Sequence, residues 1–434
     1  MPSAYNPIHR RHQYDPAGEL IRTLDKLRGE IKYEYEANGQ LHSRDTGQLL
    51  DSEEFRYDAA ANRLNFNTSQ FDHVKDNRLK RWRDQEYAYD AWGNLIEKRS
   101  GVGKLQTFVY DCENRLVKAE TLVNGKLEST GSYRYDSLGR RVGKQSVVNG
   151  VTELKHFLWQ GLRMLREESP GQSSLYLYEP GSYAPLARVD QAEGEEQKLY
   201  YFHTDQIGTP LEMTDREGQI VWQATYKAWG SVEKLAVNEI EQNLRFQGQY
   251  FDDETGLHYN TFRYYDPEVG RFVTQDPIGL LGGSNLYGYA PNTNGWIDPL
   301  GWCVTTSVTR GGGGQPLKAT ATITPKDLGT GTATNASSRA WARLLGNSDD
   351  DAGHIIGKLL GGSGGKNGVF PQLKGINRGQ FRDFESAVAN AVKKKGAVDV
   401  ELNFIYGNGG TRPTSITYDV YRQGSKILEG IFGN

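Results

Sequence analysis

One short pattern, repeated along the first third of the chain, constrains the fold more than any other feature. It consists of an aromatic residue, any residue, Tyr, Asp or Glu, two variable residues, Gly or Asn, any residue and an apolar residue. Its copies include "YEYEANGQL", "YAYDAWGNL", "FVYDCENRL" and "YRYDSLGRRV". The tyrosines of all six copies are Tyr14, Tyr35, Tyr57, Tyr89, Tyr110 and Tyr135. An internal repeat of this kind predicts a chain built from stacked copies of one structural unit.

Each copy of the pattern predicts a β-hairpin. Asp begins the turn, Gly or Asn supplies a positive φ, and the apolar residue restarts the strand. A single hairpin is only marginally stable in water, so the copies must stack side by side in an extended antiparallel sheet, with the tyrosines in rows on one face. The composition agrees, since 51 Gly and 25 Tyr against 15 Phe favour turn-rich β-structure.

The repeats stop at about residue 302, and the charge changes sign there. Residues 303–434 carry 16 Lys and Arg against 10 Asp and Glu, whereas the residues before them carry 35 against 44. A basic tail on an acidic body favours a polyanionic ligand for the tail, and equally an attraction between the two parts.

Cysteine content and the N-terminus bear on the compartment. Two cysteines, Cys112 and Cys303, cannot form a disulfide framework, which favours synthesis in a reducing cytoplasm. The first 20 residues contain no apolar core of a signal peptide, and we expect no membrane-spanning segment. If the protein leaves its cell, we expect a route that needs no N-terminal signal peptide.

The repeats and the segments that follow them resemble a known family. The segment "YYFHTDQIGTPLEMTDREGQIVWQATYKAWGSV" at 200–232 and the segment from "LRFQGQYFDDETGLHY" to "NTNGWIDPLG" at 244–301 complete the match. They resemble the tyrosine-aspartate repeat core of Rhs proteins and their relatives, the teneurins and the C components of insecticidal toxin complexes. The resemblance implies an all-β shell of antiparallel stacked hairpins over residues 1–302.

Two Asp-Pro elements lie near the end of this core, "DPIGL" at 276–280 and "DPLGW" at 298–302. Alone they would be read as turns. In the Rhs family such a pair resembles a self-cleavage site, which implies that Asp276 and Asp298 act as an aspartyl pair, one as acid and one as base. Arg271 is expected to bias their charge. The cut is expected between Trp302, where the family usually has Leu, and Cys303.

The tail divides into two parts. Residues 303–335 are rich in Gly, Thr and Ser, with four consecutive glycines at 311–314, and are predicted to be a flexible linker. Residues 336–434 predict a small α+β domain. It should contain a helix over 375–396, a strand in "AVDVELNFIYG" and a final hairpin that turns at Gln423 and Gly424.

His354, in "DDAGHIIGKLL", is the only histidine in the last third of the chain. Alone it would be taken as a capping or core residue. An imidazole is also well suited to take a proton from water near neutral pH, and hydrolysis of a phosphodiester further needs oxygen ligands for a divalent cation. Asn377 offers such a ligand. Glu385 lies eight residues further on, a little over two helical turns, and could orient metal-bound water.

These residues resemble the DNA/RNA non-specific endonucleases of the ββα-metal class, on the motifs "DAGH", "NGVFPQ" and "NRGQFRDFE". The resemblance implies that His354 is the general base and that Asn377 holds Mg²⁺ or another divalent cation. It gives Asp351 and Glu385 supporting roles. Candidate contacts to substrate phosphates are Arg378, Arg382 and Arg343. Arg339 or Arg343 is expected to supply the charge that the family often places where this chain has Ala352.

Together the two resemblances imply an interbacterial toxin in which a β-shell encloses, cuts off and delivers a Mg²⁺-dependent nuclease that degrades DNA. They also imply a cognate immunity protein, a delivery protein, and contact-dependent secretion of the type VI kind from the producer's cytoplasm into the target cell. Two alternatives stay open. One is a ribonuclease toxin. The other is an adhesion or carbohydrate-binding repeat protein, which predicts an exposed aromatic patch and no metal dependence.

Overall fold

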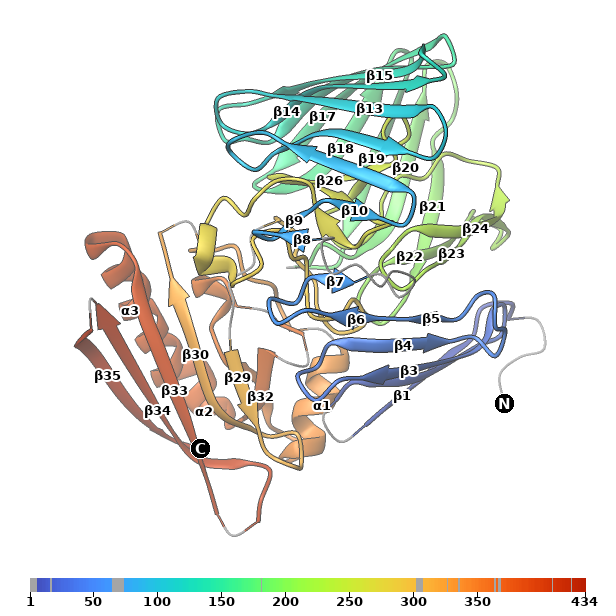
Figure 1. Ribbon diagram of the computed structural model, residues 1–434. Coiled ribbons are helices and arrows are strands. Elements are labelled where there is room, and N and C mark those ends of the chain that lie inside the picture. The colour runs from blue at the N-terminus through green and yellow to red at the C-terminus, as the bar shows by residue number, and fades with distance from the viewer. Residues whose placement is uncertain are drawn as a thin grey trace.

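The computed structural model describes residues 6–15, 18–64, 74–180, 182–301, 307–325, 327–334, 336–362, 364–365, 368–407, 409–422 and 424–434. Their regular secondary structure is mostly antiparallel strands, which confirms the predicted β-shell followed by a small α+β domain (Figure 1). None of the helices within these ranges is long and apolar enough to span a membrane.

The shell consists of hairpins paired in sequence order. The N-terminal sheet contains β1 (Arg10–Tyr14), β2 (Leu20–Asp25), β3 (Gly29–Tyr35), β4 (Leu41–Asp45) and β5 (Glu53–Glu54). Two short pairs follow, β6 (Arg56–Tyr57) with β7 (Arg63–Leu64) and β8 (Val74–Lys75) with β9 (Arg78–Leu79).

A fifteen-stranded sheet forms the main body of the described shell, and every strand pairs with the next one along the chain. Its strands are β10 (Arg81–Trp82), β11 (Gln85–Tyr89), β12 (Leu95–Ser100), β13 (Lys104–Tyr110), β14 (Leu116–Val123), β15 (Lys126–Tyr135), β16 (Arg141–Val148), β17 (Val151–Gln160), β18 (Arg163–Ser169), β19 (Gln172–Tyr178), β20 (Pro185–Ala192), β21 (Lys198–Thr204), β22 (Pro210–Thr214), β23 (Ile220–Tyr226) and β24 (Val232–Asn238).

The repeat pattern explains why these strands stack. In one copy the Asp111 carboxylate accepts the backbone N–H groups of Glu113 and Arg115, and Asn114 takes a positive φ of 59°. The Tyr110 hydroxyl donates to the carbonyl of Leu95, one repeat earlier, at 2.7 Å. The same bond recurs from Tyr35 to Leu20, from Tyr57 to Leu41 and from Tyr135 to Leu116. Each of these four tyrosines therefore ties its repeat to the preceding one.

A small four-stranded sheet packs against the large one. It contains β25 (Tyr250–Asp252), β26 (Leu257–Asn260), β27 (Arg263–Asp266) and β28 (Arg271–Phe272). Tyr250, Tyr259 and Tyr264 join the buried cluster of the large sheet. Buried charges also cross this contact, since Asp252 accepts from Arg141 at 2.5 Å and from Lys144 at 3.0 Å. This packing fixes the end of the shell, where the two Asp-Pro elements lie.

The tail domain is built on a second sheet, in the order β29 (Ser307–Arg310), β30 (Pro316–Ile323), β33 (Val398–Tyr406), β34 (Pro413–Arg422) and β35 (Ser425–Gly433). The predicted strand and final hairpin are confirmed. The prediction of a linker over 303–335 was wrong for 307–323, because the glycines at 311–314 form the tight turn between β29 and β30. Ala319, Ala321 and Ile323 alternate into the core, a period that the intervening Thr and Lys residues obscured.

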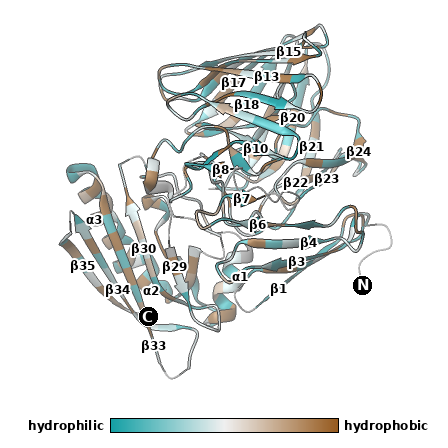
Figure 2. Cartoon of the chain, viewed as in Figure 1, coloured by the Kyte–Doolittle hydropathy of each residue, from teal (hydrophilic) through white to brown (hydrophobic). Residues whose placement is uncertain are grey.

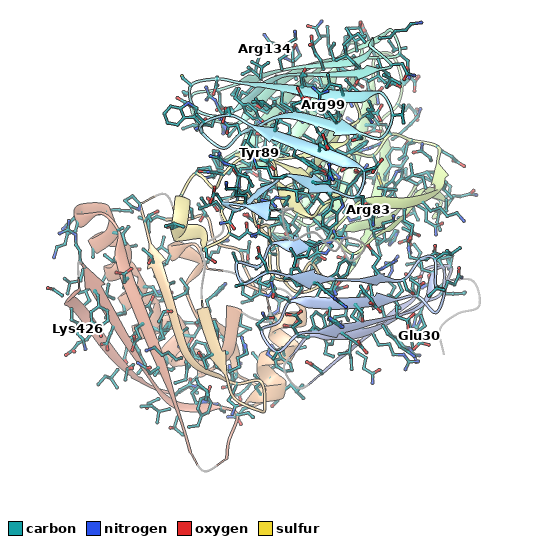
Figure 3. The ribbon with its side chains drawn as sticks, viewed as in Figure 1. Glu30, Arg83, Tyr89, Arg99, Arg134 and Lys426 are labelled. Carbon is teal, nitrogen blue, oxygen red and sulfur yellow. The ribbon has the colours of Figure 1, made fainter. Side chains whose placement is uncertain are left out.

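The remaining elements cover this sheet or lie beside it. They are α1 (Ala336–Leu345), β31 (Asp351–His354), β32 (Val369–Gln372), α2 (Lys374–Ile376), a π-helical turn (Asn377–Phe381) and α3 (Arg382–Lys395), with a short 3₁₀ turn at Lys358–Leu360. Another 3₁₀ turn, at Gly279–Gly282, belongs to the end of the shell. Residues of α3 and the π-turn pack on Tyr418 and Phe432 of the sheet. Figure 2 shows apolar and polar residues mixed along these strands, as expected of a sheet with one covered face. In Figure 3 Lys426 lies on β35, at the side of this domain away from the shell.

Candidate active site

His354 ends strand β31, which pairs with β32 at Val369. Its Nε2 lies 2.9 Å from the carbonyl oxygen of Thr332. A carbonyl can only accept, so Nε2 carries the proton of the neutral ring and Nδ1 is the nitrogen that can take one. Burial lowers the pKa of His354 below its ordinary value; the Thr332 carbonyl opposes this shift, and the charge of Lys358 adds to it. The ring is therefore a neutral base at pH 7.

Asp351, at the start of the same strand, connects β31 to the π-turn. Its carboxylate accepts from Nε and Nη2 of Arg378 at 2.7 and 2.8 Å, and from the amide nitrogen of Asn377 at 3.1 Å. The hydrogen bond from Arg378, together with that from Asn377, lowers the pKa of Asp351 although partial burial opposes the shift. Asp351 thus acts as a clamp that fixes Asn377 relative to the histidine strand.

The predicted helix over 375–396 is interrupted where its site residues lie. Residues 377–381 form a π-helical turn, and Gly379 has φ −116° and ψ −109°, outside the helical region. Asn377 and Glu385 therefore do not sit on one regular α-helix, and the eight-residue spacing does not by itself place them on one face. π-Turns of this kind occur frequently at functional sites.

Glu385 on α3 lies against the backbone of Gly357, three residues after His354. A Cβ at Gly357 would stand 2.3 Å from the Glu385 carboxyl carbon, so the glycine lets the carboxyl approach the backbone closely. Oε1 of Glu385 is buried and has no hydrogen-bond partner among the described residues. Burial raises the pKa of this carboxyl to about 8. An enclosed, unpartnered carboxyl oxygen calls for a proton, a water or a cation.

These residues fit a hard divalent cation. Asn377 uses its amide nitrogen on Asp351, which leaves its carbonyl oxygen available as a ligand for a cation. The unpartnered Oε1 of Glu385, on α3, is a separate oxygen donor of the same chemical kind. Within the described ranges, no group of three or more His, Cys, Asp or Glu side chains could hold a metal ion. A site here would therefore depend on the amide and on water.

The candidate phosphate contacts differ in how far their charge is already matched. Arg378 is paired with Asp351, and the exposed Arg382 is paired with the neighbouring Asp383. Arg339 and Arg343, one turn apart on α1, form no ion pair with any described residue. The Arg339 guanidinium donates to the Thr334 carbonyl at 2.6 Å, two residues from the carbonyl that binds His354. α1 therefore carries two arginines that have no ion-pair partner among the described residues, and Arg339 lies near the loop that holds the base.

A second site brings together the two Asp-Pro elements. Nη2 of Arg263 lies 3.1 Å from Oδ2 of Asp276 and 3.4 Å from Oδ2 of Asp298, and all three side chains are buried. The structure thus brings both carboxylates to one guanidinium nitrogen, and their role as an acid–base pair stays a prediction. The prediction for Arg271 was wrong, because its guanidinium donates to the Asn77 carbonyl and lies over the Tyr287 ring at 4.8 Å.

The second Asp-Pro element is held by β26 and the turn after it. Asn260 donates to the Asp298 carbonyl at 2.8 Å, and the Thr261 hydroxyl donates to the Pro299 carbonyl. Trp302, predicted to precede the cut, lies outside the described residues, as does Cys303. Sequence reasoning missed Arg263, whose "FRYYD" context looks like one more repeat.

Comparison with known proteins agrees with both parts of the chain. Residues 13–282 match the family model described as Teneurin YD-shell, and residues 315–424 match the one described as DNA/RNA non-specific endonuclease. The fold and site thus define a tyrosine-aspartate repeat shell of the Rhs type joined to a domain of the non-specific endonuclease family. The chain belongs to the teneurin YD-shell family, as its repeats predicted.

Two curated relatives are similar over most of the chain. "Probable deoxyribonuclease RhsA" of Dickeya dadantii (strain 3937) is 38% identical over 439 residues, which cover 98% of this chain and 30% of the relative. "Double-stranded DNA deaminase toxin A" of Burkholderia cenocepacia (strain H111) is 43% identical over 319 residues, covering 68% of this chain and 22% of the relative. The chain therefore spans less than a third of either relative. A crystal structure of TcdB2-TccC3-TEV is 18% identical with a TM-score of 0.33, covering 68% of this chain and 19% of that one.

Proposed function

We propose that this chain belongs to an interbacterial toxin whose C-terminal domain hydrolyses phosphodiester bonds of DNA in a target cell. The observation that carries the proposal is the neutral His354 ring, held through Nε2 by Thr332 within a domain that matches the non-specific endonuclease family. A half-buried imidazole whose tautomer is set by a backbone carbonyl is the arrangement expected of a general base in a hydrolase.

In this proposal Nδ1 of His354 takes the proton of a water molecule, and the water oxygen attacks the phosphorus of the scissile phosphate. The Thr332 carbonyl keeps the ring in the tautomer that leaves Nδ1 free for this step. Mg²⁺, or another divalent cation held by Asn377, supplies charge neutralisation at the phosphate and the leaving oxygen. Asp351 fixes Asn377, and Glu385 orients water at this place.

The two unmatched arginines of α1 are the proposed contacts for neighbouring phosphates. Residues one turn apart on a helix project from the same face, so Arg339 and Arg343 can follow a phosphate backbone. Arg378 and Arg382, expected in this role from the sequence, would first have to leave their carboxylate partners. We propose DNA rather than RNA as the substrate, because a relative that matches 98% of this chain is named a probable deoxyribonuclease.

Self-cleavage of the shell is the second proposed activity. One of Asp276 and Asp298 takes a proton from water, the water oxygen attacks the Trp302 carbonyl, and the other carboxyl donates its proton. The Trp302–Cys303 bond breaks, and the Cys303 nitrogen leaves as an amine. Two carboxyls that share the Arg263 guanidinium in a buried site support this pairing, since one acid and one base are required.

The wider setting follows from the same resemblance. We place the shell as the carrier of the nuclease, delivery as contact-dependent and of the type VI kind, and an immunity protein in the producer. A relative named as a toxin supports this setting. The endonuclease match over 315–424 favours an enzyme over the adhesion alternative.

The test is expression of the full chain in a host without immunity. Wild type should kill with loss of chromosomal DNA, and Asn377→Ala should not. Asn403→Ala, on the face of β33 opposite the buried Leu402 and Phe404, should kill like wild type. Killing with intact DNA and degraded RNA would move the assignment to the ribonuclease alternative.

A further inference from the structure

The turn between β26 and β27 holds the second Asp-Pro element by its backbone. Three consecutive carbonyl oxygens of that element accept hydrogen bonds from three consecutive residues of the turn. The bonds run from Asn260 to Asp298 at 2.8 Å, from Thr261 to Pro299 at 3.3 Å and from Phe262 to Leu300 at 3.2 Å. The first two donors are side chains and the third is a backbone N–H. The turn therefore fixes the backbone of residues 298–300 at every peptide.

The shell leaves this segment little room to move on its other side. Gly248 has a φ of +84°, and a Cβ built on it would stand 2.1 Å from the carbonyl oxygen of Pro299. Because that oxygen belongs to the backbone, a side chain at position 248 would push the segment out of place. Asp298 and Leu300 are buried, at 3% and 4% exposed. The segment thus lies in a close-fitting track of the shell.

Thr261 adopts a backbone conformation that threonine normally avoids. Its φ is 58°, and it is the one β-branched residue with positive φ in the part of the chain that the structure describes. The N–H of Phe262 also donates to the Asn260 carbonyl at 2.8 Å, which closes a γ-turn around Thr261. A γ-turn whose central φ is positive is rare and strained, and glycine would adopt that φ at lower cost. Strain that persists in a buried turn points to a use for the hydroxyl.

The same turn bears on the aspartyl pair. Arg263 begins β27, two residues after Thr261. Its Nη2 lies 3.1 Å from Oδ2 of Asp276 and 3.4 Å from Oδ2 of Asp298. One turn therefore sets both the backbone that carries Asp298 and the guanidinium that the two carboxylates share.

We propose that Thr261 is a positioning residue for self-cleavage, whose hydroxyl holds the segment 298–300 so that the Asp298 carboxylate stays on the guanidinium that it shares with Asp276. This inference rests on the proposed self-cleavage. Thr261 acts through the backbone of Pro299, the neighbour of Asp298, and does not itself react. Without its hydrogen bond the segment can shift, and a displacement of about 1 Å can slow catalysis about 100-fold.

The test follows release of residues 303–434 from the full chain during cell-free synthesis, on denaturing gels sampled over time. Thr261→Gly removes the hydroxyl and also relieves the strain, and Thr261→Ser keeps the hydroxyl but removes the methyl group. The matched control is Thr121→Val, which removes another buried hydroxyl of the shell that donates to a backbone carbonyl, that of Glu254 at 3.2 Å. The Tm of each variant is measured with Asp298→Asn added, so that the chains compared stay joined.

Thr261→Gly should release the fragment at least about fivefold more slowly than wild type, as expected for the loss of one hydrogen bond, with a Tm no lower than that of Thr121→Val. Thr261→Ser should recover most of the rate, and Thr121→Val should be cut like wild type.

Three results would overturn the positioning role: release from Thr261→Gly at the wild-type rate, equally slow release from Thr261→Ser, or equally slow release from Thr121→Val. Slow release from Thr261→Gly together with a Tm below that of Thr121→Val would overturn it as well, because a destabilised shell would then account for the loss. A wild-type chain that stays uncut would instead overturn self-cleavage itself, and this inference with it.

Discussion

The carbonyl oxygen of Thr332 lies 2.9 Å from Nε2 of His354, although 22 residues separate them in the chain. This bond sets the tautomer of the proposed base, so that Nδ1 faces the water to be activated. It also links the base to the loop that borders the shell, because Thr332 lines a cavity between the two parts. One carbonyl therefore connects the chemistry of the tail to its docking on the shell.

The pH dependence of cleavage should reflect the lowered pKa of His354. Burial favours the neutral ring, so the base form is present above a pKa that lies below the ordinary 6.5 and is lost only at lower pH. The acidic limb of kcat/KM for plasmid cleavage should then fall below pH 6.5. Lys358→Gln removes a cation that lowers this pKa, so its limb should move toward higher pH. A wild-type limb above pH 7 would contradict the assignment.

The raised pKa of Glu385 predicts that the folded protein becomes less stable as pH rises. Its pKa is about 8 in the folded protein against an ordinary 4.5, so folding takes up a proton. The free energy of unfolding should fall as pH rises from about 4.5 to about 8 and then level off. Glu385→Gln removes this loss, and its Tm should exceed that of wild type at pH 8 without divalent cations.

Thermal unfolding at pH 5 and pH 8 measures this difference, with Glu429→Gln, an exposed carboxylate on β35, as the control. Added Mg²⁺ should reduce the difference in Tm between wild type and Glu385→Gln at pH 8, because a bound cation stabilises the ionised carboxylate. If Tm depended on pH in the same way in wild type and in Glu385→Gln, a buried carboxyl with a raised pKa at this position would be ruled out.

The shell site predicts a contrast between two arginines. Arg263 touches both Asp276 and Asp298, whereas Arg271 contacts Asn77 and Tyr287. Arg263→Gln, Asp276→Asn and Asp298→Asn should each prevent release of residues 303–434, while Arg271→Gln should still be cut. Denaturing gels with mass spectrometry of the fragment give the answer, and release from Arg263→Gln but not from Arg271→Gln would reverse the assignment.

The sequence predicted the shell well because the repeat encodes local geometry. The Asp111 carboxylate on the turn amides and the positive φ of Asn114 are local consequences of the pattern. Arg263 and Arg271 could not be told apart from spacing, since which of them reaches Asp298 depends on how the small sheet folds back on itself.

The tail was predicted in outline but not in detail. Four glycines indicated a linker, although Gly314 at φ +81° serves a hairpin turn whose strands add to the nuclease sheet. The regular spacing of Phe381, Val388 and Val392 indicated one helix, and the π-turn at Asn377 leaves that apolar spacing intact. His354, Asp351 and Asn377 could be singled out because their motifs are short, and the structure places them on adjacent elements. Their catalytic roles stay a prediction.

The salt dependence of nucleic-acid affinity should distinguish Arg339 and Arg343, which have no ion-pair partner among the described residues, from an arginine that is paired with a carboxylate. Arg339→Gln and Arg343→Gln should weaken binding to duplex DNA and each reduce the slope of log affinity against log salt by about 1. Arg382→Gln, whose charge is paired with Asp383, should change the slope less. Fluorescence anisotropy of a labelled duplex in Ca²⁺, at several salt concentrations, measures this, and equal slopes for all three variants would remove α1 from the interface.

The central claim is that His354 acts as the base of a metal-dependent nuclease. The direct measurement is digestion of supercoiled plasmid and of total RNA by the purified protein, in Mg²⁺ and in EDTA. The His354→Ala variant is measured under the same conditions. The account predicts plasmid loss in Mg²⁺ that is absent in EDTA and absent in the variant. Unchanged plasmid and RNA with wild type in Mg²⁺, or full activity of His354→Ala, would contradict it.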